Sequence, residues 1–150
     1  MADEMETLFS ELFEAAGAGR RHGERIASLA DQTQARWQTL WTIDSMPLTV
    51  PQIGRRLGVS RQNIQRLVNE LEAESLVELS DNPDHRTSPL TALTPAGRQA
   101  LAEINASARQ SNEHIKDELG NESVAALRSL LRRFTAIVKE EEIAPRNGAH

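Results

Sequence analysis

Amide and guanidinium side chains cluster between residues 60 and 69, with a spacing that suits contact with nucleic-acid bases. Gln62, Arg66 and Asn69 share one side of a predicted helix, and Asn63 and Gln65 flank them. Glutamine and asparagine can pair bidentately with adenine, and arginine with guanine. We therefore expect Gln62, Asn63, Gln65 and Arg66 to approach base edges.

The opposite side of the same predicted helix is apolar. Its residues follow the i, i+3, i+4, i+7 spacing of a buried helical face: Ile64, Leu67, Val68 and Leu71. Ser60 precedes this helix in the position of an N-cap. The pattern predicts a helix that is held by its apolar side and presents its polar side to a partner.

A second short helix is predicted immediately before this one, within the stretch Leu48 to Leu71. Thr49 and Gln52 have the spacing of a capping box, and Pro51 lies in the first turn, where its missing N–H costs nothing. Gly58 is suited to the positive φ of a helix end. Two short helices joined by a tight turn are typical of a helix-turn-helix, whose second helix enters the major groove.

Positive charge is concentrated in this stretch although the whole chain carries a net charge of −5. Residues 45–69 contain four arginines and no acidic residue, which favours a role in neutralising phosphates. Arg55, Arg56 and Arg61 lie near helix starts and turns, where contacts to the phosphate backbone position a protein, and Arg61 also belongs to the expected recognition helix. Ser60 serves either as a phosphate ligand or only as a cap.

The pattern changes after Leu71. Leu76–Leu79 and Leu90–Leu93 are expected to form two strands of a hairpin, with turn-forming residues between them. Pro89 suits an edge strand or the first position of a strand. Asp84, His85 and Arg86 lie at the tip of the hairpin, so a permanent cation is expected on a projecting loop.

Amphipathic helices are predicted on both sides of this region. Residues 3–16 carry an apolar stripe, but glycines 17, 19 and 23 should kink, fray or break the helix. Residues 26–43 are expected to split at Asp31 or Thr33. Trp37 and Trp41 belong to the core or line a ligand cavity, and we favour the core.

Two further helices are predicted near the C-terminus. One begins at the Thr94-Pro95 pair and ends at Gly120, and the other spans 122 to about 142 with a wide apolar stripe. Terminal helices that need burial suggest a shared dimer interface. Residues 145–150 are expected to be disordered.

Several classes of protein are disfavoured. The absence of cysteine removes disulfides and thiol redox chemistry, and no apolar run reaches the length of a membrane helix. The four histidines have no metal-ligand spacing, and no phosphate-binding glycine loop or nucleophile-base pair occurs. We expect a cytoplasmic protein that is not an enzyme and needs no metal or cofactor.

The ordered set of motifs resembles the MarR family of bacterial transcriptional regulators over roughly residues 24–140. The resemblance is carried by LTVPQIGRRLGVSRQNIQRLVNELEAESLVEL followed by DNPDHRTSPLTALTPAGRQAL. It implies a mainly α fold with a small β-hairpin wing, that is, a winged helix-turn-helix flanked by dimerisation helices. The expected divisions are an N-terminal dimerisation segment (1–30), the DNA-binding domain (31–98), C-terminal dimerisation helices (99–144) and the tail (145–150).

The resemblance also implies a function and a set of contacts. A homodimer would bind double-stranded DNA at a pseudo-palindromic operator, as a regulator and by expectation a repressor. Residues 60–66 would carry the recognition contacts, and Arg86 would enter the minor groove. The family often has Asp-Arg-Arg at the wing tip, whereas the matching residues here are His85, Arg86 and Thr87, which leaves Asp84 as a substitute for the acid.

Release of DNA by a small aromatic or phenolic effector is common in the family. Arg36, Trp37 and Trp41 are the candidate pocket residues, and the alternative is a regulator without an effector. The competing function is a winged-helix adaptor that binds only protein. The sequence leaves open the operator, the regulated genes and the choice between repressor and activator.

Overall fold

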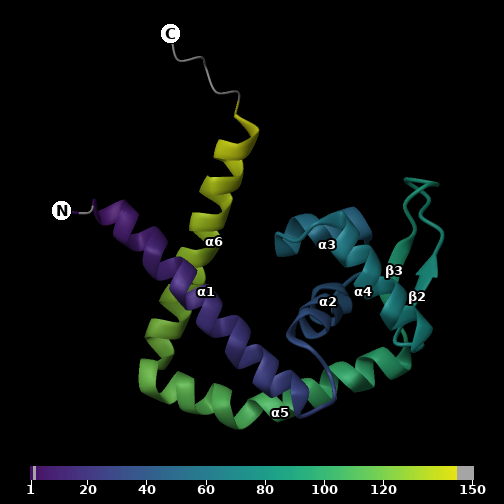
Figure 1. Ribbon diagram of the computed structural model, residues 1–150, viewed down its shortest axis with the longest axis horizontal. Coiled ribbons are helices and arrows are strands. Elements are labelled where there is room, and N and C mark those ends of the chain that lie inside the picture. Colours follow the sequence, from purple (N-terminus) through teal and green to yellow (C-terminus); the bar gives the residue numbers. More distant parts are fainter. Residues whose placement is uncertain (2, 145–150) are drawn as a thin grey trace. The chain divides into compact units, whose positions relative to one another are not determined.

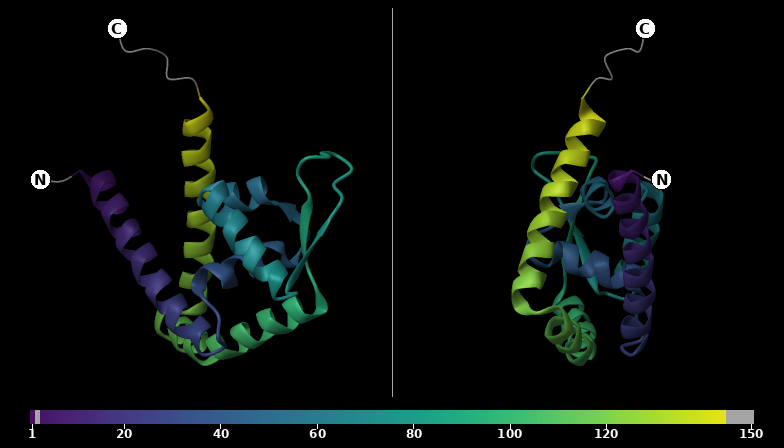
Figure 2. Two further views of the ribbon diagram at one scale, coloured as in Figure 1. Left: turned by 45° about the vertical axis from the view of Figure 1, so that its right-hand side comes forward. Right: turned by 90° about the vertical axis from the view of Figure 1, so that its left-hand side faces the viewer.

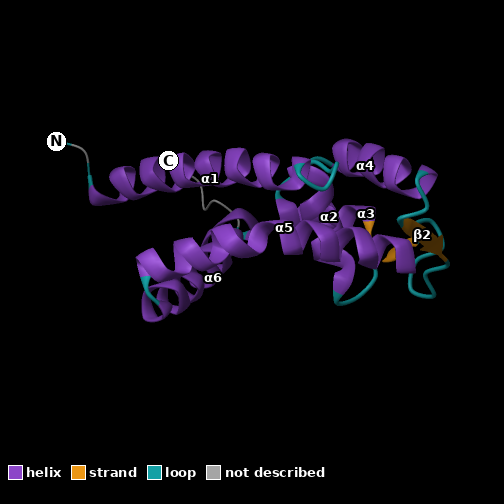
Figure 3. Cartoon of the chain, turned by 90° about the horizontal axis from the view of Figure 1, so that it is seen from below, coloured by secondary structure: helices purple, strands orange, loops and turns teal. Residues whose placement is uncertain are grey.

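The computed structural model describes residues 1 and 3–144, and the chain divides into two compact units, Met1–Ala108 and Arg109–His150. Helices dominate the described residues, and the strands are short (Figures 1 and 3). The elements in chain order are α1 (Glu4–Ser28), α2 (Gln34–Asp44), β1 (Leu48–Thr49), α3 (Val50–Leu57), α4 (Arg61–Ala73), β2 (Val77–Ser80), β3 (Leu90–Leu93), α5 (Pro95–Leu119) and α6 (Asn121–Ile143).

The core of the first unit lies where α2, α3, α4, the sheet and the first half of α5 meet. Figure 1 shows α2, α3 and α4 gathered beside the hairpin of β2 and β3. The side chains at the centre are fully buried: Leu40, Ile53, Ile64, Leu71 and Ile104. Burial of these apolar surfaces is the main force that fixes the direction of each short helix.

The expected hairpin is part of a three-stranded antiparallel sheet, with strand order β1-β3-β2. β1 was not predicted from the sequence, and its two residues pair with β3 in the register Leu48 with Thr91 and Thr49 with Leu90. A two-residue strand has no periodicity, so only its partner could reveal it. The hairpin is thereby attached directly to the start of α3.

The first hairpin strand begins one residue later than expected. Leu76 belongs to the turn that closes α4, because its N–H donates to the carbonyl of Leu71, and Ser75 before it has a φ of 60°. β3 follows the prediction, with buried Thr91 and Leu93 alternating with more exposed residues. Pro89 precedes β3 and therefore removes no N–H from the central strand.

The helix expected to kink, fray or break at its glycines runs as one helix from Glu4 to Ser28, so the alternative of a break is wrong. Gly23 is buried, and a Cβ added there would lie 2.8 Å from Cγ of Gln34. The glycine permits close approach of α1 and α2 and does not interrupt the helix. This tertiary contact outweighs the low intrinsic helix propensity of glycine.

The predicted split before α2 is confirmed at Thr33. Its hydroxyl accepts a hydrogen bond from the backbone N–H of Arg36 at 3.2 Å, as an N-cap does.

The expectation that both tryptophans are core residues holds only for Trp37, which packs against the core. Trp41 is 61% exposed, so the core interpretation is wrong for that residue.

The start of α5 is fixed by Thr94. Its hydroxyl donates to the carbonyl of Ser75 at 2.6 Å and accepts from the N–H of Gly97 at 3.0 Å. We expect Thr94→Val to lower the free energy of unfolding by about 1–2 kcal/mol, because both hydrogen bonds are lost. Urea denaturation followed by circular dichroism measures this, with Thr135→Val on exposed α6 as control. Equal effects of the two substitutions would contradict the capping role.

The second unit contains the end of α5 and all of α6, which meet at Gly120 with a φ of 87°. Both helices match the prediction to within a residue or two. No described residue of α6 is buried, and most of its large apolar side chains are exposed: Leu127, Leu130, Leu131, Ile137 and Ile143. The tail expected to be disordered, residues 145–150, lies outside the described residues.

Candidate nucleic-acid interface

The helix-turn-helix is built from three local capping devices. Thr49 and Gln52 form a reciprocal capping box, with hydrogen bonds of 3.3 and 2.8 Å. Gly58 ends α3 in the left-handed conformation, with a φ of 66°. Ser60 then begins α4, and its hydroxyl accepts from the N–H of Asn63 at 3.2 Å. These devices were all foreseen from the sequence, and they hold the two helices at a tight turn.

The inner and outer sides of α4 separate as predicted. Its apolar side is buried, with Leu67 the most accessible member at 6%: Ile64, Leu67, Val68 and Leu71. The opposite side is exposed to solvent: Arg61, Gln62, Asn63, Gln65, Arg66 and Asn69. The core thus fixes the rotation of α4 about its own axis and keeps its amide and guanidinium groups accessible.

The outer side of α4 carries two side-chain pairs one turn apart. Nε2 of Gln65 donates to Oδ1 of Asn69 at 2.9 Å, and Nη1 of Arg66 donates to Oε1 of Glu70 at 2.9 Å. Sequence reasoning placed Gln65, Arg66 and Asn69 correctly but missed Glu70. Its i, i+4 spacing from Arg66 was the signal that could have identified the pair.

The wing comprises β2, β3 and the loop 81–89, and its tip projects beyond the ends of α3 and α4 (Figure 2). Asn82 organises the loop, because its Nδ2 donates to the carbonyl of Ser88 at 3.1 Å and its Oδ1 accepts from the N–H of Asp84 at 3.1 Å. Asp84, His85 and Arg86 are exposed at the tip. A cation is therefore presented on a closed loop.

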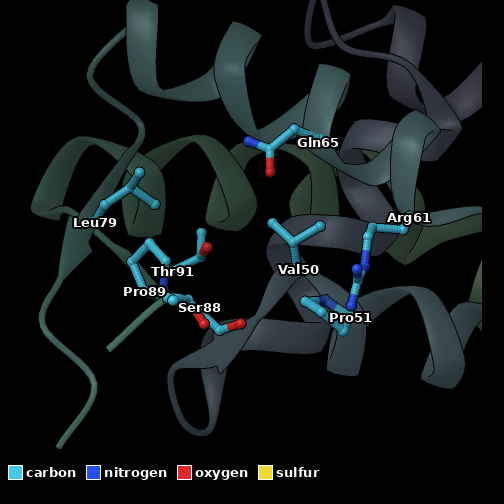
Figure 4. A pocket seen from close by; sticks show the side chains of 9 residues that line it. Val50, Pro51, Arg61, Gln65, Leu79, Ser88, Pro89 and Thr91 are labelled. Atoms are coloured by element: carbon cyan, nitrogen blue, oxygen red, sulfur yellow. The ribbon is translucent and has the colours of Figure 1, made fainter. Parts of the chain in front are cut away.

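A hollow of about 400 Å³ lies between α4 and the wing. Arg61 and Gln65 border it from α4, and Leu79 and Thr91 from the wing (Figure 4). A second hollow, of about 610 Å³, is lined by residues that include Arg55, Arg61, Asp84 and His85. The structure therefore brings expected recognition, phosphate and wing residues together around shared depressions, whereas Arg56 and Arg86 line neither of these two.

The three candidate effector residues have different surroundings. Arg36 forms an ion pair with Glu74 at the end of α4, and its side chain is 14% exposed. Nε1 of Trp37 donates to Oδ1 of Asn105 at 3.0 Å. Trp41 is exposed. Sequence reasoning did not foresee the partners Glu74 and Asn105, because both lie far from α2 in the chain.

No helix in the described part of the chain is long and apolar enough to cross a membrane. Among residues 1 and 3–144, no group of three or more potential metal ligands is placed to hold an ion.

Comparison with known proteins gives matches that span the interface. A model described as MarR family matches residues 31–86. An uncharacterised protein of Mycobacterium tuberculosis (strain ATCC 25618 / H37Rv) is 45% identical over 141 residues, covering 94% of this chain and 99% of the relative. The HTH-type transcriptional regulator TcaR of Staphylococcus aureus (strain Newman) is 32% identical over 103 residues, or 67% of this chain and 68% of that protein.

Solved structures share the fold. A mutant MarR of E. coli, crystallised in complex with operator DNA, superposes with a TM-score of 0.70 at 21% identity, covering 89% of this chain and 99% of that one. Identity at this level establishes similarity of fold. The mainly α winged helix-turn-helix expected from the sequence is thus confirmed.

Proposed function

The chain belongs to the MarR family of transcriptional regulators, and we propose that it is a sequence-specific DNA-binding repressor that acts as a homodimer on a pseudo-palindromic operator. The observation that carries the proposal is the outer side of α4. Its amide and guanidinium groups are exposed while the opposite side is locked into the core. A helix presented in this way can enter the major groove.

The proposed contacts divide by chemistry. Gln62, Asn63, Gln65 and Arg66 would contact base edges, where amides select adenine and guanidinium selects guanine. Phosphates would be bound by Arg55, Arg56 and Arg61, and by the N-terminus of α4 beside Ser60.

The wing would extend the contact to a second groove. Arg86 is exposed at its tip, where its charge can enter the negative potential of a minor groove. His85 and Asp84 lie beside it on the same loop. The E. coli structure of similar fold contains operator DNA, which supports a double-stranded DNA partner for this fold.

The proposed dimer is supported by apolar side chains that are exposed to solvent on two helices. On α1 these are Met5, Leu8, Phe9 and Phe13, and on α6 Leu127, Leu130 and Leu131 are each at least 42% exposed. On each helix, a row of exposed apolar side chains supports an interaction site. A two-fold dimer would place its recognition helices in half-sites roughly 34–36 Å apart.

An effector is part of the proposal. A small aromatic or phenolic acid would bind near Arg36 and Trp37, where a largely buried cation lies one residue from an indole. Trp41 would contribute its exposed ring. Such a ligand can release DNA only if it binds the released conformation more tightly than the DNA-bound one. Because the proposed partner is DNA, the protein would act in the cytoplasm.

The decisive experiment is a gel shift with the DNA upstream of the protein's own gene, compared with a scrambled duplex of equal length. We expect Arg55→Ala to weaken binding to both duplexes similarly and Arg66→Ala to weaken operator binding more, by about 1–3 kcal/mol, because only base contacts discriminate sequence. Equal losses on every duplex would exclude a base-reading role for Arg66. No binding to any DNA would favour the adaptor function.

A further inference from the structure

An acidic residue lies on the side of α4 that the proposed function turns toward DNA. Glu70 lines a shallow hollow on this side together with Arg61, Gln62, Gln65, Arg66 and Asn69. It is the first acidic residue after Asp44 in the sequence. A carboxylate at this position opposes the approach of phosphates, so its presence requires an explanation.

Stability does not provide that explanation. The ion pair of Arg66 and Glu70 is exposed, with side-chain accessibilities of 61% and 44%, and exposed i, i+4 pairs contribute little. The order of the two charges is also the less favourable one, since an acid stabilises a helix best when it precedes its basic partner. The pair therefore matters more for where the guanidinium is held than for folding.

The geometry leaves Arg66 able to bind a base. Only Nη1 donates to Glu70, and a guanidinium has five N–H donors, so donors remain for the O6 and N7 acceptors of guanine. The carboxylate keeps the side chain along the helix and repels the phosphate oxygens that a free arginine would otherwise reach. The hydrogen bond from Gln65 to Asn69 likewise holds the adjacent Gln65 side chain along the helix.

We propose that Glu70 is a positioning residue that sets sequence specificity by holding Arg66 for base contact and disfavouring its contact with phosphate. The inference rests on the proposed DNA-binding function. It assigns to an acidic residue the task of weakening sequence-independent binding, so that more of the contribution of Arg66 depends on the base it meets.

The test measures DNA affinity as a function of salt for the full-length protein and for Glu70→Gln, Arg66→Ala and the double variant. The probes are a duplex selected in vitro by the unmodified protein and a scrambled duplex of the same length. We expect Glu70→Gln to tighten binding to the scrambled duplex and to steepen the slope of log K against log salt by about 0.9, the value for one added phosphate contact. Its affinity would then fall about 3.5-fold further between 50 and 200 mM salt.

The matched control is Glu72→Gln, which removes the same charge from an exposed position about 200° around the helix. Equal changes in Glu70→Gln and Glu72→Gln, with DNA binding intact, would overturn this inference but leave the proposed function standing. A slope that is steeper in the double variant than in Arg66→Ala alone would also overturn it. A group other than Arg66 would then make the added phosphate contact. Failure of the unmodified protein to bind any duplex would overturn the proposed function and the inference with it.

Discussion

Gly97→Ala is expected to destabilise the first unit by about 3 kcal/mol, the upper end of what overpacking costs, because an added Cβ would overlap backbone that cannot move independently. A Cβ at Gly97 would lie 1.9 Å from the carbonyl oxygen of Leu76 and 3.0 Å from its carbonyl carbon. The same oxygen accepts the N–H of Thr94 at 3.1 Å. Relief of the overlap would therefore separate α5 from the turn after α4.

Chemical denaturation of the purified variant measures this loss, and Gly19→Ala provides the matched control. Gly19 lies exposed within α1, and a Cβ there meets no heavy atom within 4 Å. That substitution should raise the free energy of unfolding by about 0.5–1 kcal/mol, since alanine is the better helix former. A Gly97→Ala protein as stable as the unmodified one would show that the contact with Leu76 can relax.

The second large effect is expected from charge placed on α6. Leu127→Glu combined with Leu131→Glu puts two carboxylates one turn apart on the exposed apolar stripe, where an interface would have to bury them. If this stripe joins two copies, the variant should be monomeric. Its operator affinity should fall by about 10²–10⁴-fold, because the two half-sites would no longer be bound by one linked molecule.

Analytical ultracentrifugation and gel shifts on the same preparations measure the two effects together. Ser129→Glu adds a carboxylate to the exposed opposite side of α6, and it should leave the mass and the operator affinity unchanged. A dimeric double-glutamate variant would show that the proposed interface lies elsewhere.

The sequence predicted those features that depend on local spacing. The burial of Ile64, Leu67 and Val68, the caps at Thr49 and Ser60, and the left-handed Gly58 follow from side-chain period and backbone sterics within a few residues. Each of these features has a signal within a few residues of the chain, so the sequence alone suffices to identify it.

Features that depend on distant partners were not predicted. Gly23 was taken for a helix breaker, because the close contact that it permits is with Gln34 in the next helix and leaves no local signal. β1 exists only through its pairing with β3. Trp41 was assigned to the core from its spacing, yet spacing does not show how far a neighbouring helix extends to cover a side chain. In the candidate interface, the amide residues were foreseen, whereas Glu70 was passed over because acids are not expected where DNA binds.

Because Asn82 closes the wing loop, the folding of the loop and its proposed contact with DNA depend on different residues. Since the Asn82 side chain closes the loop through backbone groups of Asp84 and Ser88, the exposed side chains of His85, Arg86 and Thr87 contribute little to folding. Substitutions at the tip should therefore leave the protein folded, while each one would alter the contact proposed between the loop and DNA. The tip can therefore carry His85 and Thr87, in place of the acid and arginine that the resemblance led us to expect, without loss of the fold.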